Sequence, residues 1–292
     1  MFDRLLFPTD GSDGAAAALD HVLDIAAAHD ATVHVLNVAD TNLDSVTRLG
    51  GDIVDVLERE GEGIVEEAAT RADRRGVATI TEVLQGEPYS TIVDYAAARD
   101  VDLVVMPTRG RGGLGRLLLG STTERVVRRS DVPVLTLRPD GTDVAYPYRD
   151  VLVPTDGSDC ATAALRVGID VAAAEGAALH LLSVVDVASL GVDVRADIQT
   201  TAMRESADAI VEEAAALATD AGVDPVSTTV EEGTSIHRTI RSYVTDHDVD
   251  LVVLGTHGRT GFDRYVLGSV AEKLVRSSPV PVLTVRNPAD EV

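Results

Sequence analysis

A glycine-rich segment in the second half of the chain has the spacing of a phosphate-binding loop. Its glycines follow the pattern Gly255-x2-Gly258-x9-Gly268-Ser269. Glycine tolerates positive φ and lets a ligand approach the backbone closely, so successive N–H groups can point at one phosphate. The segment ends where a helix is expected to begin, and a helix N-terminus adds free N–H donors and a positive dipole end. The spacing therefore indicates a cradle for a triphosphate.

The end of this segment also fits a purely structural role. Ser269-x-x-Glu272, like Ser121-x-x-Glu124 in the first half, matches a capping box, in which the serine caps the helix and stabilises it by about 1 kcal/mol. The two interpretations are compatible, because a capped helix can still offer N–H groups to an anion.

Basic residues in this loop, and in the segment 106–123 of the first half of the chain, favour an anionic ligand. The chain has 25 basic and 48 acidic residues and a net charge of −23, yet the loops keep arginines. These are Arg109, Arg111, Arg116, Arg259 and Arg264. Arginine is the side chain best suited to phosphate recognition, so its presence here predicts an anion site. A solvated basic surface is the alternative.

The segment Pro-Thr-Asp-Gly-Ser-Asp, which occurs twice, places a carboxylate at a second candidate position. Asp10 and Asp156 follow short apolar runs that are expected to be strands. At the carboxyl end of a parallel strand, a carboxylate can accept a hydrogen bond from a base amine or a ribose hydroxyl. A turn-forming role for both aspartates is equally compatible with the sequence, and Ser12 and Ser158 are candidate helix caps.

An internal duplication organises these motifs into two domains. Residues 5–13 recur at 151–159, an offset of 146, and residues 132–136 recur at 280–284, an offset of 148. A period of this length indicates two whole domains rather than a solenoid. A turn-rich segment, 139–148, separates them. The predicted domains are 1–139 and 149–287.

Within each repeat, β-branched runs alternate with alanine-rich amphipathic segments, which predicts an α/β fold with a parallel sheet covered by helices on both faces. The expected strands of the first repeat are 4–8, 31–38, 78–84, 101–107 and 132–138, with helices at 13–29, 52–75, 88–99 and 120–130. The expected strands of the second are 150–154, 177–185, 226–231, 249–255 and 280–286. Such doubly wound folds bind ligands at the carboxyl ends of their strands.

Taken together, these motifs resemble the ATP-binding branch of the universal stress protein (UspA-like) family in a tandem two-domain form. The resemblance covers nearly the whole chain and implies two five-stranded parallel sheets of strand order 3-2-1-4-5. It implies that ATP is the ligand, with Mg²⁺ as the ion that would accompany its phosphates. It also implies that the two domains form an intramolecular pseudo-dimer that covers both fifth strands, and it leaves further oligomerisation open.

The resemblance assigns binding roles to matching residues of both repeats. In the second repeat, Asp156 and the backbone of Val184 would hold adenine. The ribose and phosphates would lie among Gly255, Gly258, Arg259, Gly268, Ser269 and Val270. The first repeat offers a weaker set, which is Asp10, Val38, Gly110, Arg111, Gly120, Ser121 and Thr122. Its first glycine is replaced by Pro107, which lacks an N–H, so the second site is predicted to bind ATP more tightly.

Composition excludes several other classes of protein. The acidic balance argues against nucleic-acid binding, because phosphate contacts need a positive surface. No apolar run reaches the roughly 20 residues of a membrane span, and no secretory leader is evident, so a cytoplasmic location is expected. Cys160 has no second cysteine to pair with. The histidines lack metal-ligand spacing and no nucleophile motif occurs, so neither a metal site nor a catalytic residue is predicted.

The charge pattern further indicates a salt-adapted protein. Lys273 is the single lysine, tryptophan is absent and aspartate dominates the acidic residues, a composition typical of halophilic microbes. The predicted function is that of a cytoplasmic nucleotide-binding stress or regulatory protein that is not an efficient enzyme, although slow ATP hydrolysis stays open. The alternatives are a nucleotide-dependent hydrolase or transferase, and an interaction scaffold that binds no nucleotide.

Overall fold

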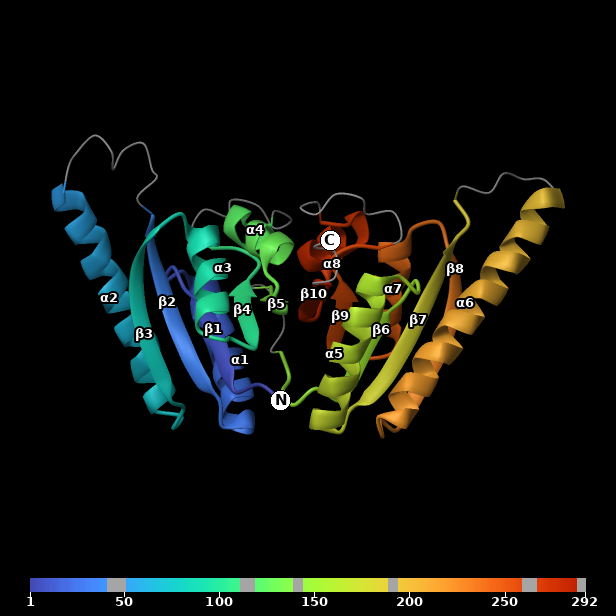
Figure 1. Ribbon diagram of the computed structural model, residues 1–292, viewed down its shortest axis with the longest axis horizontal. Helices are drawn as coiled ribbons and strands as arrows, with labels where there is room; N and C mark the ends of the chain where they lie inside the picture. The colour runs from blue at the N-terminus through green and yellow to red at the C-terminus, as the bar shows by residue number, and fades with distance from the viewer. Residues whose placement is uncertain (41–50, 111–118, 139–143, 189–193, 259–266, 288–292) are drawn as a thin grey trace. The chain divides into compact units, whose positions relative to one another are not determined.

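The computed structural model divides into two compact units, Met1–Gly141 (unit 1) and Thr142–Val292 (unit 2). It describes residues 1–40, 51–110, 119–138, 144–188, 194–258 and 267–287. Each unit is a parallel sheet flanked by helices on both faces (Figure 1). This is the α/β class that the alternation of apolar strands and amphipathic helices predicts.

Unit 1 has five parallel strands in the order β3-β2-β1-β4-β5. Helices α1 and α2 pack on one face, whereas α3 and α4 pack together on the other. The elements in chain order are β1 (Arg4–Pro8), α1 (Asp13–His29), β2 (Thr32–Asp40), α2 (Gly51–Asp73), β3 (Thr79–Gly86), α3 (Pro88–Ala98), β4 (Leu103–Pro107), α4 (Ser121–Arg129) and β5 (Val134–Leu137).

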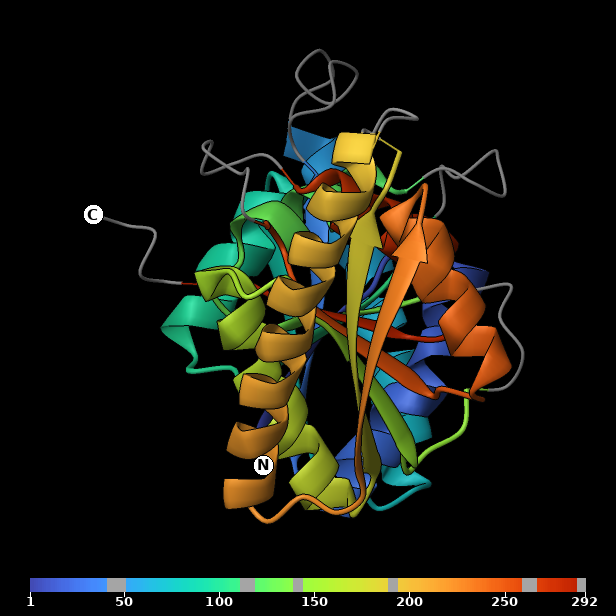
Figure 2. The same cartoon turned by 90° about the vertical axis from the view of Figure 1, so that its right-hand side faces the viewer.

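Unit 2 repeats this arrangement, with the strand order β8-β7-β6-β9-β10. The long helix α6 runs beside β7 and β8 (Figure 2). The elements are β6 (Asp150–Pro154), α5 (Asp159–Glu175), β7 (Ala178–Asp186), α6 (Val194–Asp220), β8 (Val226–Gly233), α7 (Ile236–Asp246), β9 (Leu251–Gly255), α8 (Ser269–Ser277) and β10 (Val282–Val285). Within each unit the order is therefore the predicted 3-2-1-4-5.

Burial of both faces of the sheet explains why the strand sequences are continuous apolar runs. Leu5, Leu6 and Phe7 are successive residues of β1, and all three are buried. Successive strand side chains point to opposite faces, so this burial requires helices on both sides of the sheet. The winding reverses between β1 and β4, where chain connections leave in opposite directions, and a ligand site is expected at the carboxyl ends of these two strands.

The described residues contain neither a candidate membrane span nor a candidate metal cluster. None of the helices there is long and apolar enough to cross a membrane. No cluster of three or more His, Cys, Asp or Glu side chains in that part of the chain could hold a metal ion.

Candidate functional site

A cavity of about 400 Å³ lies in unit 1 at the predicted place. Six of the seven residues predicted for the first site line it: Asp10, Val38, Gly110, Gly120, Ser121 and Thr122. The seventh, Arg111, lies outside the described residues. Pro88, Ile92 and Met106 form an apolar wall of the cavity. The cavity thus combines an apolar wall, a carboxylate and a glycine loop, a combination that suits a small-molecule site.

Asp10 has the turn-forming role that the sequence leaves open, and it also lies against the loop after β4. Its Oδ1 accepts the N–H of Ser12 at 3.0 Å, which makes the predicted turn. A Cβ added at Gly110 would collide with its Oδ2. Only a glycine at position 110 therefore lets the loop after β4 pass so close to this carboxylate. This glycine is needed for the close approach of the loop to Asp10.

The start of α4 differs from the predicted capping box. Gly120 is the N-cap, with extended backbone angles, and its carbonyl accepts the N–H of Glu124 at 2.9 Å. Ser121 is already the first helical residue, so its hydroxyl is not in the capping position and the capping-box prediction is wrong; the same holds for Ser269 after Gly268. Neither helix start has a side-chain cap among the described residues, and the N–H groups of a helix N-terminus suit an anion whether or not the helix is capped.

Helices α1 and α5 do begin with the predicted caps. Ser12 Oγ accepts the N–H of Ala15 at 3.2 Å, and Ser158 Oγ accepts that of Ala161 at 3.3 Å. Each cap follows directly on the aspartate turn, so the local sequence fixes the direction in which the chain leaves β1 and β6.

Unit 2 places Asp156 beside Gly258, as unit 1 places Asp10 beside Gly110. Asp156 Oδ1 accepts the N–H of Ser158 at 3.0 Å, and a Cβ added at Gly258 would lie 2.8 Å from Asp156 Oδ2. Gly268 donates its N–H to the carbonyl of Thr256 at 2.8 Å. Val184 lies near the end of β7, and Ser269 and Val270 begin α8. Arg259 and the rest of 259–266 lie outside the described residues.

The exchange of Gly255 for Pro107 is accompanied by a second exchange, in the helix that follows the aspartate turn. A Cβ added at Gly255 would lie 2.8 Å from both the carbonyl oxygen and the Sγ of Cys160. In unit 1 the position of Cys160 is occupied by Gly14, at the same offset of 146 residues. The Sγ contact has no counterpart in unit 1, because Gly14 has no side chain, whereas the contact with the carbonyl oxygen involves a backbone atom that every residue has.

Cys160 has a histidine neighbour that the sequence did not reveal. Burial alone would raise the pKa of this thiol, but hydrogen bonds from His257 and Thr256 outweigh burial, and the net pKa is lowered. Thr256 Oγ1 lies 3.8 Å from Sγ and 3.0 Å from His257 Nδ1. With only 5% of Cys160 exposed, the thiol faces the protein interior rather than solution. No spacing signal could have paired residues almost a hundred positions apart.

Asn37 is a second residue that sequence reasoning missed. Its side chain is 7% exposed, and its Nδ2 donates to the carbonyl of Thr9 at 2.8 Å, directly before Asp10. A Cβ added at Gly61 of α2 would lie 2.5 Å from Asn37 Oδ1. The corresponding pair in unit 2 is Ser183 and Ala207. In unit 1 the helix thus has glycine where the strand has the larger asparagine, and in unit 2 the helix has alanine where the strand has the smaller serine.

Comparisons with known proteins agree with this architecture. The model of the universal stress protein family matches residues 1–138 and 147–286. A universal stress protein of Mycobacterium bovis is 32% identical over 241 residues, which cover 78% of each chain. The crystal structure of a universal stress protein from Archaeoglobus fulgidus has a TM-score of 0.71 at 25% identity and covers 97% of this chain and 98% of its own.

A third similar protein is a universal stress protein solved in complex with cAMP. It is 29% identical, with a TM-score of 0.38, and it covers 47% of this chain and 97% of its own. Both halves of the present chain match the family model, and the strand order, the aspartate turns and the glycine loops recur in each unit. The chain belongs to the universal stress protein family, in a tandem form.

Proposed function

We propose that the protein binds ATP or a related adenine nucleotide at the carboxyl ends of the strands in both units and acts in a stress response or its regulation. The observation that carries this proposal is the 400 Å³ cavity, which gathers six predicted binding residues from three separate stretches of unit 1. Asp10 would accept from a base amine or ribose hydroxyl, and the uncapped start of α4 suits phosphate. Mg²⁺ would accompany the phosphates.

The residues around the cavity favour binding over catalysis. The described lining contains one charged side chain, Asp10, which is already engaged in its turn. A general base needs a proton-accepting group in reach of the reacting atom, and none besides Asp10 is found among the described lining residues. We therefore propose a nucleotide-responsive regulator in the cytoplasm, with the two units associated as a pseudo-dimer, rather than an efficient ATPase.

Identification of retained nucleotide tests this function directly. Freshly purified protein is denatured, and released small molecules are identified by mass spectrometry. We expect an adenine nucleotide to be released. If the protein releases none and ATP, ADP and cAMP all fail to bind in calorimetry, the scaffold alternative is correct instead.

We further expect stability to increase with salt concentration. At a net charge of −23, repulsion among the 48 acidic residues opposes the compact state, and molar salt screens it to a Debye length of roughly 3 Å. The melting temperature should therefore rise from low to molar KCl in a calorimetric scan. A melting temperature that stays constant or falls over this range would contradict salt adaptation.

A further inference from the structure

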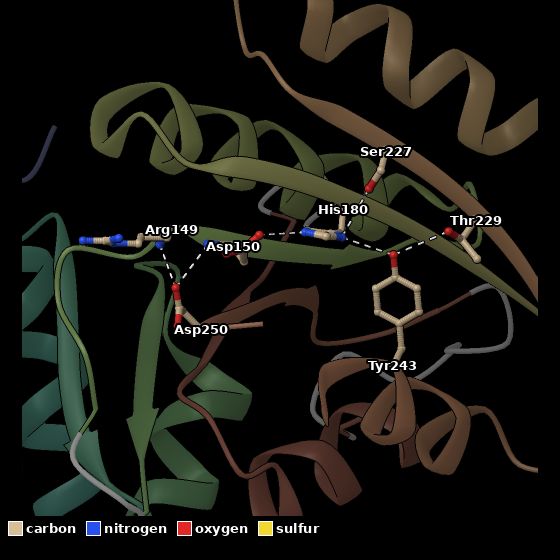
Figure 3. A network of polar contacts seen from close by, with 7 residues as sticks. All are labelled: Arg149, Asp150, His180, Ser227, Thr229, Tyr243 and Asp250. Carbon is tan, nitrogen blue, oxygen red and sulfur yellow. Dashed lines mark hydrogen bonds and ion pairs between the residues drawn. The ribbon is translucent and has the colours of Figure 1, made fainter. Parts of the chain in front are cut away.

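A histidine of unit 2 connects a carboxylate and a hydroxyl away from the nucleotide site (Figure 3). His180 on β7 has its Nε2 3.1 Å from Oδ1 of Asp150, at the start of β6. Its Nδ1 lies 3.2 Å from Oγ of Ser227 on β8. One imidazole thus has an acceptor on one side and a hydroxyl on the other, which is the arrangement of an activated nucleophile.

The hydrogen-bond partners determine where the protons lie. A carboxylate only accepts, so Nε2 of neutral His180 donates to Asp150, and Nδ1 presents a lone pair. Tyr243 Oη is also 3.2 Å from Nδ1, but it has a second acceptor in Oγ1 of Thr229 at 3.4 Å. An arrangement in which Ser227 donates to His180 and Tyr243 donates to Thr229 gives the Ser227 and Tyr243 hydroxyls an acceptor each.

The groups that orient Ser227 are themselves held in place. Oδ2 of Asp250 accepts the backbone N–H groups of Arg149 at 2.8 Å and Asp150 at 3.2 Å (Figure 3). The ring of Tyr243 meets His180 edge to face at 5.9 Å and stacks on His247 at 4.0 Å. The backbone of Asp150 and the ring of His180 are therefore held in place before any substrate arrives.

Ser227 is accessible from solution, and a suitable backbone donor lies next to it. The serine is exposed, on the outer strand of the sheet of unit 2. Alternate N–H groups of an outer strand point away from the sheet, and the bond from Leu179 N to the Pro225 carbonyl assigns Thr228 to that outward set. The N–H that follows a nucleophile is one donor of the oxyanion hole in serine hydrolases.

We propose that Ser227 is a nucleophile activated by His180, and that it accepts acyl groups from small activated donors such as aryl esters and thioesters. Oγ attacks the carbonyl carbon while Nδ1 of His180 takes the hydroxyl proton, and Asp150 stabilises the resulting imidazolium. The bond from that carbon to the leaving oxygen or sulfur then breaks. The leaving group departs with the electron pair and receives the proton from His180, which leaves an ester on Ser227 and a free alcohol or thiol.

Unit 1 shows that the histidine alone does not require this arrangement. His34 also contacts a tyrosine hydroxyl, that of Tyr95 at 3.0 Å, but Arg4 replaces the aspartate and Ile80 replaces the serine. Burial, followed by the charge of Arg99, lowers the pKa of His34. The histidine–tyrosine contact is thus common to both units and structural, whereas the hydroxyl and the carboxylate occur only in unit 2.

Site-resolved acetylation of the full chain tests the proposal. The protein is incubated with p-nitrophenyl acetate, and acetylation of each serine is followed by peptide mass spectrometry. We expect Ser227 to react at least about ten-fold faster than Ser206, an exposed serine of α6. His180→Gln should slow Ser227 by about 100-fold, the contribution of a general base, and leave Ser206 unchanged. Ser227→Ala should remove the fast-reacting site.

Asp150→Asn is the second variant, because Asp150 is part-exposed and its backbone contacts to Asp250 remain. An amide cannot stabilise the imidazolium, so acetylation of Ser227 should again fall. Equal rates at Ser227 and Ser206 in the wild type would overturn the proposal. So would a fast rate at Ser227 that persists in both His180→Gln and Asp150→Asn. Acetylation of Ser227 does not depend on ATP, so this experiment tests the nucleophile independently of the proposed nucleotide site.

Discussion

Gly258→Asp should abolish ATP binding in unit 2, and Gly110→Asp should abolish it in unit 1. An added Cβ at Gly258 lies 2.8 Å from Asp156 Oδ2, and one at Gly110 collides with Asp10. An aspartate at either position displaces the resident carboxylate and sets a second negative charge beside the phosphates. We expect a loss of about 3 kcal/mol or more at the altered site, which is roughly 100-fold in affinity. Calorimetric titration of each variant measures the remaining site.

The wild type should show two unequal sites, with unit 2 the tighter. Pro107 lacks the N–H that Gly255 has, and one hydrogen bond to a charged oxygen is worth about 1.5 to 3 kcal/mol, or roughly ten-fold to over a hundred-fold in affinity. Equal sites would instead show that Gly255 is needed only for its packing against Cys160.

Two control variants show whether the loss of affinity comes from the position, the charge or the size of the new side chain. Gly63→Asp adds the same charge on α2, where a Cβ meets nothing within 4 Å, and should leave both affinities unchanged. Gly258→Asn adds the same bulk without charge, and the difference from Gly258→Asp measures the electrostatic part. Binding in unit 2 that survives Gly258→Asp would exclude the proposed site there.

Gly61→Ala should destabilise unit 1, and Asn37→Ser should restore its stability. The added methyl group would lie 2.5 Å from Asn37 Oδ1 and 2.9 Å from Val83 Cγ1. Overpacking of this kind costs about 1 to 3 kcal/mol, partly offset by about 1 kcal/mol of helix propensity gained over glycine. Asn37→Ser removes the nearer clash and recreates the serine–alanine pair of unit 2. Urea unfolding of the wild type, both single variants and the double variant gives the coupling energy.

Unit 2 offers the reciprocal experiment. Ser183→Asn beside Ala207 should be destabilising, and Ala207→Gly should relieve it. We expect coupling of about 1 to 2 kcal/mol in both units, within the range for residues in contact. Additive effects in both cycles would mean that the backbone adjusts, and that Asn37 and Gly61 are independent. Because Asn37 holds the Thr9 carbonyl beside Asp10, ATP affinity of Asn37→Ser reports whether this contact also supports the site.

The sequence by itself determined the duplication, the α/β class and most of the candidate site. Apolar strands and amphipathic helices are local patterns, so β1 begins and ends at the predicted residues, 4 and 8, and α1 at 13 and 29. The aspartate turn and its serine cap are also local, because Asp10 bonds Ser12 only two residues away. Parallel strands with helical crossovers place their carboxyl ends along one edge, so residues far apart in the chain could be assigned to one cavity.

Only the tertiary structure decided which residues of separate helices, strands and loops contact each other. The capping-box prediction was wrong because Gly120 itself has extended backbone angles and donates its N–H to the carbonyl of Thr108, a contact that the Ser-x-x-Glu motif does not encode. Asn37 with Gly61, Cys160 with Gly255, and Asp150 with His180 and Ser227 are contacts between separate elements. The geometry of these contacts depends on strand register and helix packing. Both are set by how side chains of the whole core fit together, which no local sequence pattern shows. One chain can therefore repeat the same fold while its two halves surround the same histidine with different chemistry.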